Sequence, residues 1–492
     1  MPEEQKDLDL VSKLTPEELA EKRFSLRCLN PDDGKYWSTT KKLSPYISAE
    51  AEWMAAVNVQ RVLLETRVEF GQAEKRHLDE FDAAIPKIDP LNISLLEDKV
   101  TKHDQLAVVE EIGRHVYPEV KALLHPGTTS YDILDTLRSY LFKKAWYDLI
   151  RPEVCKSIEN LCQLAEQTIA QLQVGRTHLQ KTSPVPFGAT LALYAARMAE
   201  RVASCDARFN DLRGKVSGIV GTGASIEMVI GEGKALKFEE RVLEKLGLKP
   251  DYTATQIVQK EKLVDVGNGM LTLMLVLKDF ANDMRILYSA DINEVTSRDS
   301  KDRLGGSSAD AAKNNPINYE NMRGKAKVVE AGMVVLYDMV VSDLQRDLSG
   351  SVEARYEPQG IMAKMYESFC RLNRELGQLS VNVDRMSANL QPVRDNPSEA
   401  MTAILRGQPE WIHSEYGVGH DFVKQMSKKA QKEKRKLLEV SLEDPEFKAL
   451  YDTLPELKKG ILKGRLEDYT GAAAEKAVMN IAYAISVVEA KK

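Results

Sequence analysis

The stretch VDVGNGMLTLMLVLKDFANDMRILYSA, residues 264–290, decides the fold class. It follows Glu261 and carries only scattered charges, so it predicts one long helix over residues 261–290. At a rise of roughly 1.5 Å per residue, such a helix would be about 45 Å long. Because its apolar side chains point in most directions, we expect it to lie in the middle of a helical bundle.

Two other segments predict long helices of the same kind. Residues 153–174 contain neither Gly nor Pro, and their apolar residues recur at steps of three and four. Residues 319–341 continue the pattern through AKVVEAGMVVLYDMVV. We find no alternating strand pattern of convincing length and no strand–helix–strand rhythm, which argues against a parallel nucleotide-binding sheet.

The sequence therefore predicts an all-α protein with three helical domains. These are an N-terminal helical domain over residues 1–126, a central long-helix bundle over 127–376 and a C-terminal helical domain over 377–492. Helices with little polar surface are most easily explained if other subunits cover them. The long helices thus also predict a homo-oligomer.

The composition excludes several classes of protein. The chain has 492 residues, is 43% hydrophobic and carries a formal net charge of −6, which argues against a nucleic-acid binder. Its longest apolar run, MLTLMLVL, is far too short to span a membrane. The five cysteines form no CxxC pair, and the segment MPEEQKDLDL resembles no targeting signal. We therefore expect a cytoplasmic protein with reduced thiols.

The first of three polar patches combines KHDQLAVVEEIG with HPGTTSYDILDTL. Thr129 and Asp132 have the spacing of a capping box at the start of a helix, which is the structural interpretation. The functional interpretation is an anion site, because a helix N-terminus with hydroxyl groups and a nearby imidazole suits a carboxylate.

The second patch, GRTHLQKTSPVPFG, places His178 at the end of the helix predicted over residues 153–174. A lone histidine at a helix end is more often structural than catalytic. The third patch, GGSSADAAKNNPINYE (305–320), fits either a surface linker or a mobile loop with a catalytic group. Beyond it, LQRDLSGSVEARY is typical of a solvated, charged helix end, although Arg346, Ser351 and Arg355 would also suit a phosphate.

Taken together and in this order, the patches resemble the fumarase/aspartase superfamily of lyases, which eliminate fumarate from a substituted succinate. The resemblance covers most of the chain. The signature loop departs from the family pattern at Asp310 and Ala311, and the second region departs at Thr182 and Pro186. The matching residues are Thr129, Ser130 and Asp132 in the first region, Thr177, His178, Gln180, Pro184 and Gly188 in the second, and Gly306, Ser307, Ser308, Lys313, Asn315 and Pro316 in the loop.

Within this superfamily the chain is most similar to the branch that acts on succinyl-purine nucleotides. The similarity lies in NPDDGKYWS from Asn30, where Lys35 replaces an arginine, in DYTGAA from Asp468 and in LQRDLSGSVEAR. Further matches are His103 with Asp104, His125, and Thr255 with Gln256. Fumarase, aspartase and argininosuccinate lyase share the three regions, but their substrates carry no phosphate for Arg346, Ser351 and Arg355.

The resemblance implies that the protein releases fumarate from adenylosuccinate, giving AMP, and from succinylaminoimidazole-carboxamide ribotide. It implies that Ser307 is the general base, activated by Lys313 and loop N–H groups, and that His178 is the general acid, tuned by Glu320. His103 would assist at the phosphate or the leaving group. The substrate-binding residues implied are Lys35, Tyr36, Asp104, His125, Thr129, Ser130, Gln256, Ser308, Asn315, Arg346, Ser351 and Arg355.

The resemblance also implies a homotetramer in which three subunits contribute to each active site, with no metal and no cofactor. The sequence contains no HExxH motif and no Cys/His cluster that would supply a metal site. Two alternatives stay open: another fumarate-releasing lyase, similar to argininosuccinate lyase, and a non-catalytic homo-oligomer of lyase ancestry. The lysine-rich run KKAQKEKRK from Lys428 predicts a solvated helix face rather than a nucleic-acid tail.

Overall fold

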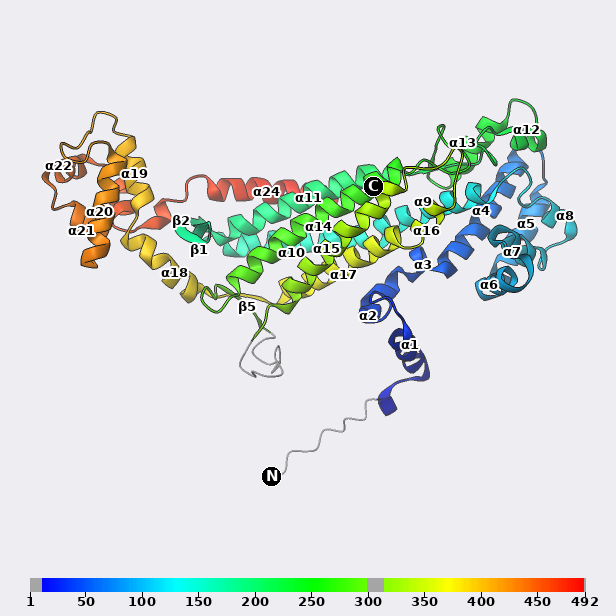
Figure 1. Ribbon diagram of the computed structural model, residues 1–492, viewed down its shortest axis with the longest axis horizontal. Helices are drawn as coiled ribbons and strands as arrows, with labels where there is room; N and C mark the ends of the chain where they lie inside the picture. Colours follow the sequence, from blue (N-terminus) through cyan, green and yellow to red (C-terminus); the bar gives the residue numbers. More distant parts are fainter. Residues whose placement is uncertain (1–10, 299–313, 491–492) are drawn as a thin grey trace, which may run out of the picture. The chain divides into compact units, whose positions relative to one another are not determined.

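The computed structural model describes residues 11–298 and 314–490 (Figure 1). Helices dominate this part of the chain, and its strands form only two-stranded sheets, so the predicted all-α class is confirmed. None of the described helices is both long enough and apolar enough to cross a membrane.

Most of the helices are short, and the longest come from the middle of the chain. In the first half they are α1 (Pro16–Arg27), α2 (Trp37–Thr40), α3 (Ser44–Ile47), α4 (Ala49–Glu69), α5 (Lys75–Ala84), α6 (Pro90–Leu96), α7 (Asp104–Gly113), α8 (Pro118–Ala122), α9 (Ser130–Ala145), α10 (Arg151–Thr168), α11 (Phe187–Asn210), α12 (Ala224–Ile230) and α13 (Ala235–Lys245). In the second half they are α14 (Glu261–Leu287), α15 (Ile317–Asp338), α16 (Ser349–Glu353), α17 (Glu357–Gln378), α18 (Val383–Asp395), α19 (Ser398–Arg406), α20 (Gly419–Glu433), α21 (Leu437–Ser441), α22 (Pro445–Thr453), α23 (Glu456–Leu462) and α24 (Ala473–Glu489).

The strands pair two by two. β1 (Leu172–Thr177) and β2 (Gln180–Pro186) form an antiparallel hairpin, with Leu172 opposite Pro186 and Thr177 opposite Gln180. β3 (Arg213–Gly214) runs parallel to β4 (Lys249–Pro250), and β5 (Val295–Ser297) runs antiparallel to β6 (Leu379–Val381).

The chain divides into two compact units. Unit 1 comprises residues 1–154, 201–275 and 324–371, and unit 2 comprises residues 155–200, 276–323 and 372–492. The division into three domains along the sequence stays a prediction.

The longest predicted helix is confirmed as α14, which ends three residues earlier than expected. From Lys262 to Tyr288 no residue of the segment is fully exposed, as its all-round apolar pattern predicted. The helix predicted over residues 319–341 is confirmed as α15, and the run from Lys428 begins on exposed positions of α20.

The prediction of a helix over residues 153–174 is partly wrong, and so is the placement of His178 at its end. The helix α10 stops at Thr168, and the next residues form β1. The physical reason lies in unit 2, where the buried carboxylate of Glu294 accepts hydrogen bonds from Gln173 and Arg176. A register shift between Val174 and Arg176 interrupts the alternation of the strand, so that both side chains reach this one acceptor. Pairing with β2 satisfies the N–H and C=O groups of the extended backbone.

In unit 1, α9 packs against α4 and starts at the predicted capping box. The Thr129 side chain accepts from the backbone N–H of Asp132, whose carboxylate accepts from the N–H of Thr129 at 2.7 Å. The same carboxylate is fully buried beside the ammonium group of Lys215 and accepts from the N–H groups of Ser217 and Gly218. One aspartate thus fixes both the start of α9 and the segment after β3.

Candidate active site

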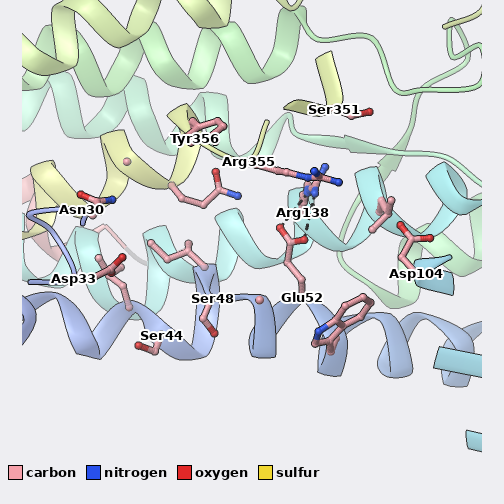
Figure 2. Close-up of a pocket in the computed structure, with 18 of the residues that line it drawn as sticks. Asn30, Asp33, Ser44, Ser48, Glu52, Asp104, Arg138, Ser351, Arg355 and Tyr356 are labelled. Atoms are coloured by element: carbon pink, nitrogen blue, oxygen red, sulfur yellow. Dashed lines mark hydrogen bonds and ion pairs between the residues drawn. The ribbon is translucent and has the colours of Figure 1, made fainter. Parts of the chain in front are cut away.

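Unit 1 contains a cavity of about 960 Å³, which we call the unit-1 cavity (Figure 2). Its walls come from residues 24–53, from residues 97–104, from the first half of α9 and from residues 346–363. Six of the residues predicted to bind substrate or to take part in catalysis line it: His103, Asp104, Ser130, Arg346, Ser351 and Arg355. Tertiary structure therefore brings together side chains that lie more than two hundred positions apart in the sequence.

His103 lies immediately before α7 and caps it. Its Nδ1 accepts from the backbone N–H of Leu106 at 3.4 Å and lies 3.3 Å from the carboxylate of Asp104. Its Nε2 lies 3.2 Å from the Ser130 hydroxyl, at the start of α9. In the neutral tautomer with Nδ1 as acceptor, Nε2 carries the hydrogen and donates to Ser130. The imidazole therefore links two helix N-termini, an arrangement that suits an anion.

Arg346 is oriented by two partners at the cavity wall. Its Nη1 donates to Oε1 of Gln256 at 2.9 Å, and its Nη2 donates to Oγ of Ser351 at 3.0 Å. A guanidinium has five N–H donors, so the group keeps donors for a ligand while its plane is fixed. Gln256, predicted to bind substrate, thus contacts the cavity through Arg346.

Several other charged residues in the cavity were not singled out from the sequence. Arg138 of α9 donates through Nε and Nη2 to the Glu52 carboxylate of α4, as the dashed lines in Figure 2 show. Lys102 and Glu97 line the cavity as well. Burial raises the pKa of the Glu97 carboxyl, and the nearby charge of Asp104 raises it further. The sequence offered one signal for Arg138: it lies two helical turns after Tyr131 on the same predicted helix.

Besides Gln256, four predicted binding residues of unit 1 lie away from the cavity lining. Lys35 is exposed, and Thr129 caps α9. The ring of Tyr36 lies under the ammonium group of Lys325, 3.4 Å from its centroid, and burial lowers the pKa of Lys325 to about 8. His125 is bonded through Nδ1 to Gln60 and Thr128, and burial lowers its pKa.

His178 lies in unit 2, at the tip of the β1–β2 hairpin. His178 and Leu179 form the turn, with φ values of 53° and 60°, a left-handed conformation that is unfavourable for residues other than glycine. Strained backbone of this kind persists only where the surrounding structure enforces it, and it is frequent at functional sites.

The base of the same hairpin is held by Glu294, which is fully buried. Its carboxylate accepts from Gln173 at 2.8 Å, from Arg176 at 2.6 Å and from Asn389 of α18 at 2.8 Å. Glu294 directly precedes β5, the last strand before residues 299–313. One carboxylate therefore connects the His178 hairpin to the segment that leads toward the signature loop.

The remaining predicted residues belong to the signature loop and to the helix after it. Glu320 and Asn315 lie at the start of α15 and just before it, and both belong to unit 2. Glu320 is exposed, and no hydrogen bond or ion pair joins it to His178 among the described residues. Ser307, Ser308 and Lys313 lie outside the residues that the structure describes.

No group of three or more His, Cys, Asp or Glu side chains in the described ranges, 11–298 and 314–490, could hold a metal ion. What the unit-1 cavity offers instead is a set of arginine, serine and histidine donors. Such donors bind carboxylate and phosphate groups through charge-assisted hydrogen bonds.

Comparison with known proteins identifies the family. A family model described as "Lyase" matches residues 35–330. Adenylosuccinate lyase of Aquifex aeolicus is 30% identical over 437 residues, which cover 87% of this chain and 93% of that protein. Adenylosuccinate lyase of a Synechocystis species is 31% identical over 327 residues, covering 65% of this chain and 69% of that protein.

The fold has counterparts among solved structures. The 3-carboxy-cis,cis-muconate lactonizing enzyme of Pseudomonas putida superimposes with a TM-score of 0.78 at 20% identity, covering 93% of this chain and 99% of that chain. At this identity the likeness shows the shared fold alone. The family match and the relatives along most of the chain show that this protein is a carbon–nitrogen lyase of the fumarate-releasing kind and belongs to the adenylosuccinate lyase family, within the fumarase/aspartase superfamily.

Proposed function

We propose that this protein eliminates fumarate from adenylosuccinate, leaving AMP, and acts in the same way on succinylaminoimidazole-carboxamide ribotide, both steps of purine biosynthesis. The observation that carries the proposal is the cluster of Arg346, Ser351 and Arg355 in the same cavity as His103 and Ser130. A phosphate needs such a cluster of donors, and the substrates of fumarase, aspartase and argininosuccinate lyase have no phosphate.

The reaction needs a base and an acid. The base takes a proton from the carbon next to a succinyl carboxylate, the released electron pair forms the double bond of fumarate, and the carbon–nitrogen bond breaks. The acid then supplies a proton to the leaving nitrogen of the purine nucleotide. The charge that develops on the carboxylate must be stabilised electrostatically, so donors and cations have to surround it.

We assign the base to Ser307 and the acid to His178. A serine hydroxyl is a poor base unless its alkoxide is stabilised, and in our proposal Lys313 and the N–H groups of the loop stabilise it. The strained turn at the tip of the hairpin supports the role of His178, because it presents the imidazole on a rigid element. Glu320 is its proposed partner.

The proposed binding roles combine the resemblance to the family with the placement of the described side chains. Arg346, Ser351 and Arg355 hold the phosphate, and His103 with Asp104 and Ser130 borders the leaving group. Ser308, Asn315 and Thr129 bind succinyl carboxylates. Lys35, Tyr36 and His125 lie away from the cavity lining, so we propose that they act at a site completed by another subunit.

We further propose a homotetramer with shared active sites. The end of α15 and the residues directly after it, all in unit 1, expose an apolar stripe, in which Val334 is 69%, Tyr337 48% and Val341 75% exposed. Apolar residues on one helix face that recur at steps of three or four are suited to packing against another helix. A homotetramer would cover this stripe. The five cysteines all lie in the described part of the chain and form no disulfide there, which supports a reducing compartment such as the cytoplasm.

An assay with four substrates tests the proposed activity. Adenylosuccinate, argininosuccinate, aspartate and malate are offered separately, and the release of fumarate or AMP is followed by ultraviolet absorbance. We expect turnover of adenylosuccinate alone, and loss of that turnover in Ser307→Ala with an unchanged oligomer. Turnover of argininosuccinate instead would establish the first alternative, and no turnover of any substrate would favour a non-catalytic homo-oligomer.

Mixing two inactive variants tests the shared sites. Ser307→Ala and His178→Ala carry different affinity tags and are unfolded and refolded together, so that mixed oligomers can be isolated through both tags. If one site takes Ser307 and His178 from different subunits, the mixed oligomers regain part of the wild-type activity. Isolated mixed oligomers that stay inactive would refute shared sites.

A further inference from the structure

Tyr131, which is 6% exposed, lies on α9 directly after Ser130 and has no role in the assignments above. The guanidinium group of Arg346 lies over its ring, with Cζ 3.9 Å from the ring centroid. Arg346 is therefore held on three sides: by the aromatic face of Tyr131, by Gln256 Oε1 and by Ser351 Oγ. A cation this close to an aromatic face is attracted by the ring, most strongly when both are shielded from water.

The hydroxyl of Tyr131 reaches the second member of the anion-binding cluster. It is hydrogen-bonded to Oγ of Ser351, which is itself 8% exposed. A serine hydroxyl has one hydrogen and two acceptor positions. If Tyr131 donates, both acceptor positions of Ser351 are filled, one by Tyr131 and one by Arg346. The single hydrogen of Ser351 then remains for an oxygen of a ligand.

We propose that Tyr131 is a positioning residue that sets the orientation of Arg346 through its ring and of Ser351 through its hydroxyl. The inference rests on the proposed function and deepens it, because it makes Tyr131 the residue on which recognition of the nucleotide phosphate depends. A pre-oriented arginine and serine lose little conformational entropy when the phosphate binds. The proton transfers are not expected to depend on Tyr131.

Two substitutions separate the two parts of the side chain. Tyr131→Phe keeps the ring under Arg346 and removes the bond to Ser351, while Tyr131→Leu removes both. We expect KM for adenylosuccinate to rise roughly 2- to 10-fold in Tyr131→Phe and a further 3- to 30-fold in Tyr131→Leu, with kcat unchanged in both. The matched control is Tyr140→Phe, on the same helix and under the cation of Lys144, but outside the unit-1 cavity.

A substrate without the phosphate gives the decisive comparison. For succinyladenosine, the Tyr131 variants should behave like the wild type, because the groups that they disturb have no phosphate to bind. Calorimetry should show the same difference between ligands with and without a phosphate: the Tyr131 variants should bind AMP more weakly than the wild type and adenosine equally well. An equal loss for AMP and adenosine, or a fall in kcat without a rise in KM, would refute the positioning role.

A double-mutant cycle tests the route through Ser351. If the Tyr131 hydroxyl acts through Ser351, Tyr131→Phe should have no further effect on AMP binding in a Ser351→Ala background. Equal effects in both backgrounds would contradict that route. If the wild-type protein neither converts adenylosuccinate nor binds AMP, the proposed function fails and this inference fails with it. If the wild type does both and the variants match it, only the inference fails.

Discussion

The hairpin that carries His178 and the cavity that contains Arg346 hold their side chains in different ways. In the hairpin, a paired backbone and one buried carboxylate place the imidazole at a strained turn. In the cavity, side chains from separate parts of unit 1 orient one another through contacts such as that of Tyr131 with Arg346. Removing the buried carboxylate of Glu294 should therefore disrupt the whole hairpin and displace His178. In the cavity, by contrast, each substitution should weaken ligand binding only by the contribution of its own side chain.

The largest expected effect comes from removing the anchor of the hairpin. Glu294→Ala leaves the guanidinium group of Arg176, which is 10% exposed, without its carboxylate. Breaking one partner of a buried ion pair costs about 3–5 kcal/mol. We expect that loss in the free energy of unfolding, measured in urea, together with a fall of kcat by two orders of magnitude or more if His178 is the acid.

The matched control is Glu467→Ala, which removes the carboxylate partner of Arg394 in the same unit. That carboxylate is 56% exposed, so its loss should cost no more than about 1 kcal/mol and leave kcat unchanged. Similar losses in the two variants would show that Glu294 is not a special anchor.

A smaller effect should follow from changing the strain in the turn. Leu179 is 65% exposed, so its side chain contributes little packing and the backbone decides the outcome. Leu179→Val should destabilise the protein by about 1–2 kcal/mol, because a β-branched residue fits the left-handed region poorly. Leu179→Gly should be as stable as the wild type. Equal melting behaviour of the two variants would mean that the turn is not strained.

The pH dependence of stability should reveal the buried histidine of unit 1. Burial lowers the pKa of His125 in the folded state, whereas the unfolded chain titrates near 6.5. As the pH falls below about 6.5, the unfolded state therefore binds a proton that the folded state resists, and stability decreases down to the lowered pKa. Above about pH 6.5, where His125 is neutral in both the folded and the unfolded state, this contribution to the free energy of unfolding is fully present.

The slope is at most about 1.4 kcal/mol per pH unit. His125→Asn, which tolerates the positive φ of this position, should remove that part of the pH dependence. The measurement is urea unfolding at roughly pH 7.5 and 5.5. His420→Asn, at an exposed position on α20, is the control that should change nothing. An identical pH dependence in His125→Asn and in the wild type would contradict this explanation.

The smallest effect should appear in the cavity itself. Glu97 adds a carboxylate to a cavity that we propose to bind a phosphate, so Glu97→Gln should lower KM for adenylosuccinate by roughly two- to fivefold. The value of kcat should not change. A raised KM would instead mean that the Glu97 carboxylate contacts the substrate favourably.

Local patterns accounted for the parts of the fold that depend on neighbouring residues. The apolar repeat over residues 261–290 predicted α14, and the spacing of Thr129 and Asp132 predicted the start of α9. The hairpin was missed because its turn, His178–Leu179, lacks the Asn-Gly or Asp-Gly signal of tight hairpins. Residues 172–174 also continued the apolar spacing of the preceding helix.

The sequence predicted only in part which residues come together in the candidate site. Resemblance to the superfamily identified Arg346, Ser351 and His103, which the cavity brings together. It gave no reason to single out Tyr131, Glu294 or the pair of Arg138 with Glu52, because each acts through a contact with a distant segment.

The sequence alone determined the all-α class and the family, since helical periodicity, caps and short motifs are local properties of the chain. Tertiary structure decided which of the matched residues share one cavity and which hold one another in place. The stacking of Arg346 on Tyr131 joins positions far apart in the chain, and its geometry exists only after α9 and the segment before α16 have packed in unit 1. Such contacts depend on distance and burial, which no local pattern encodes.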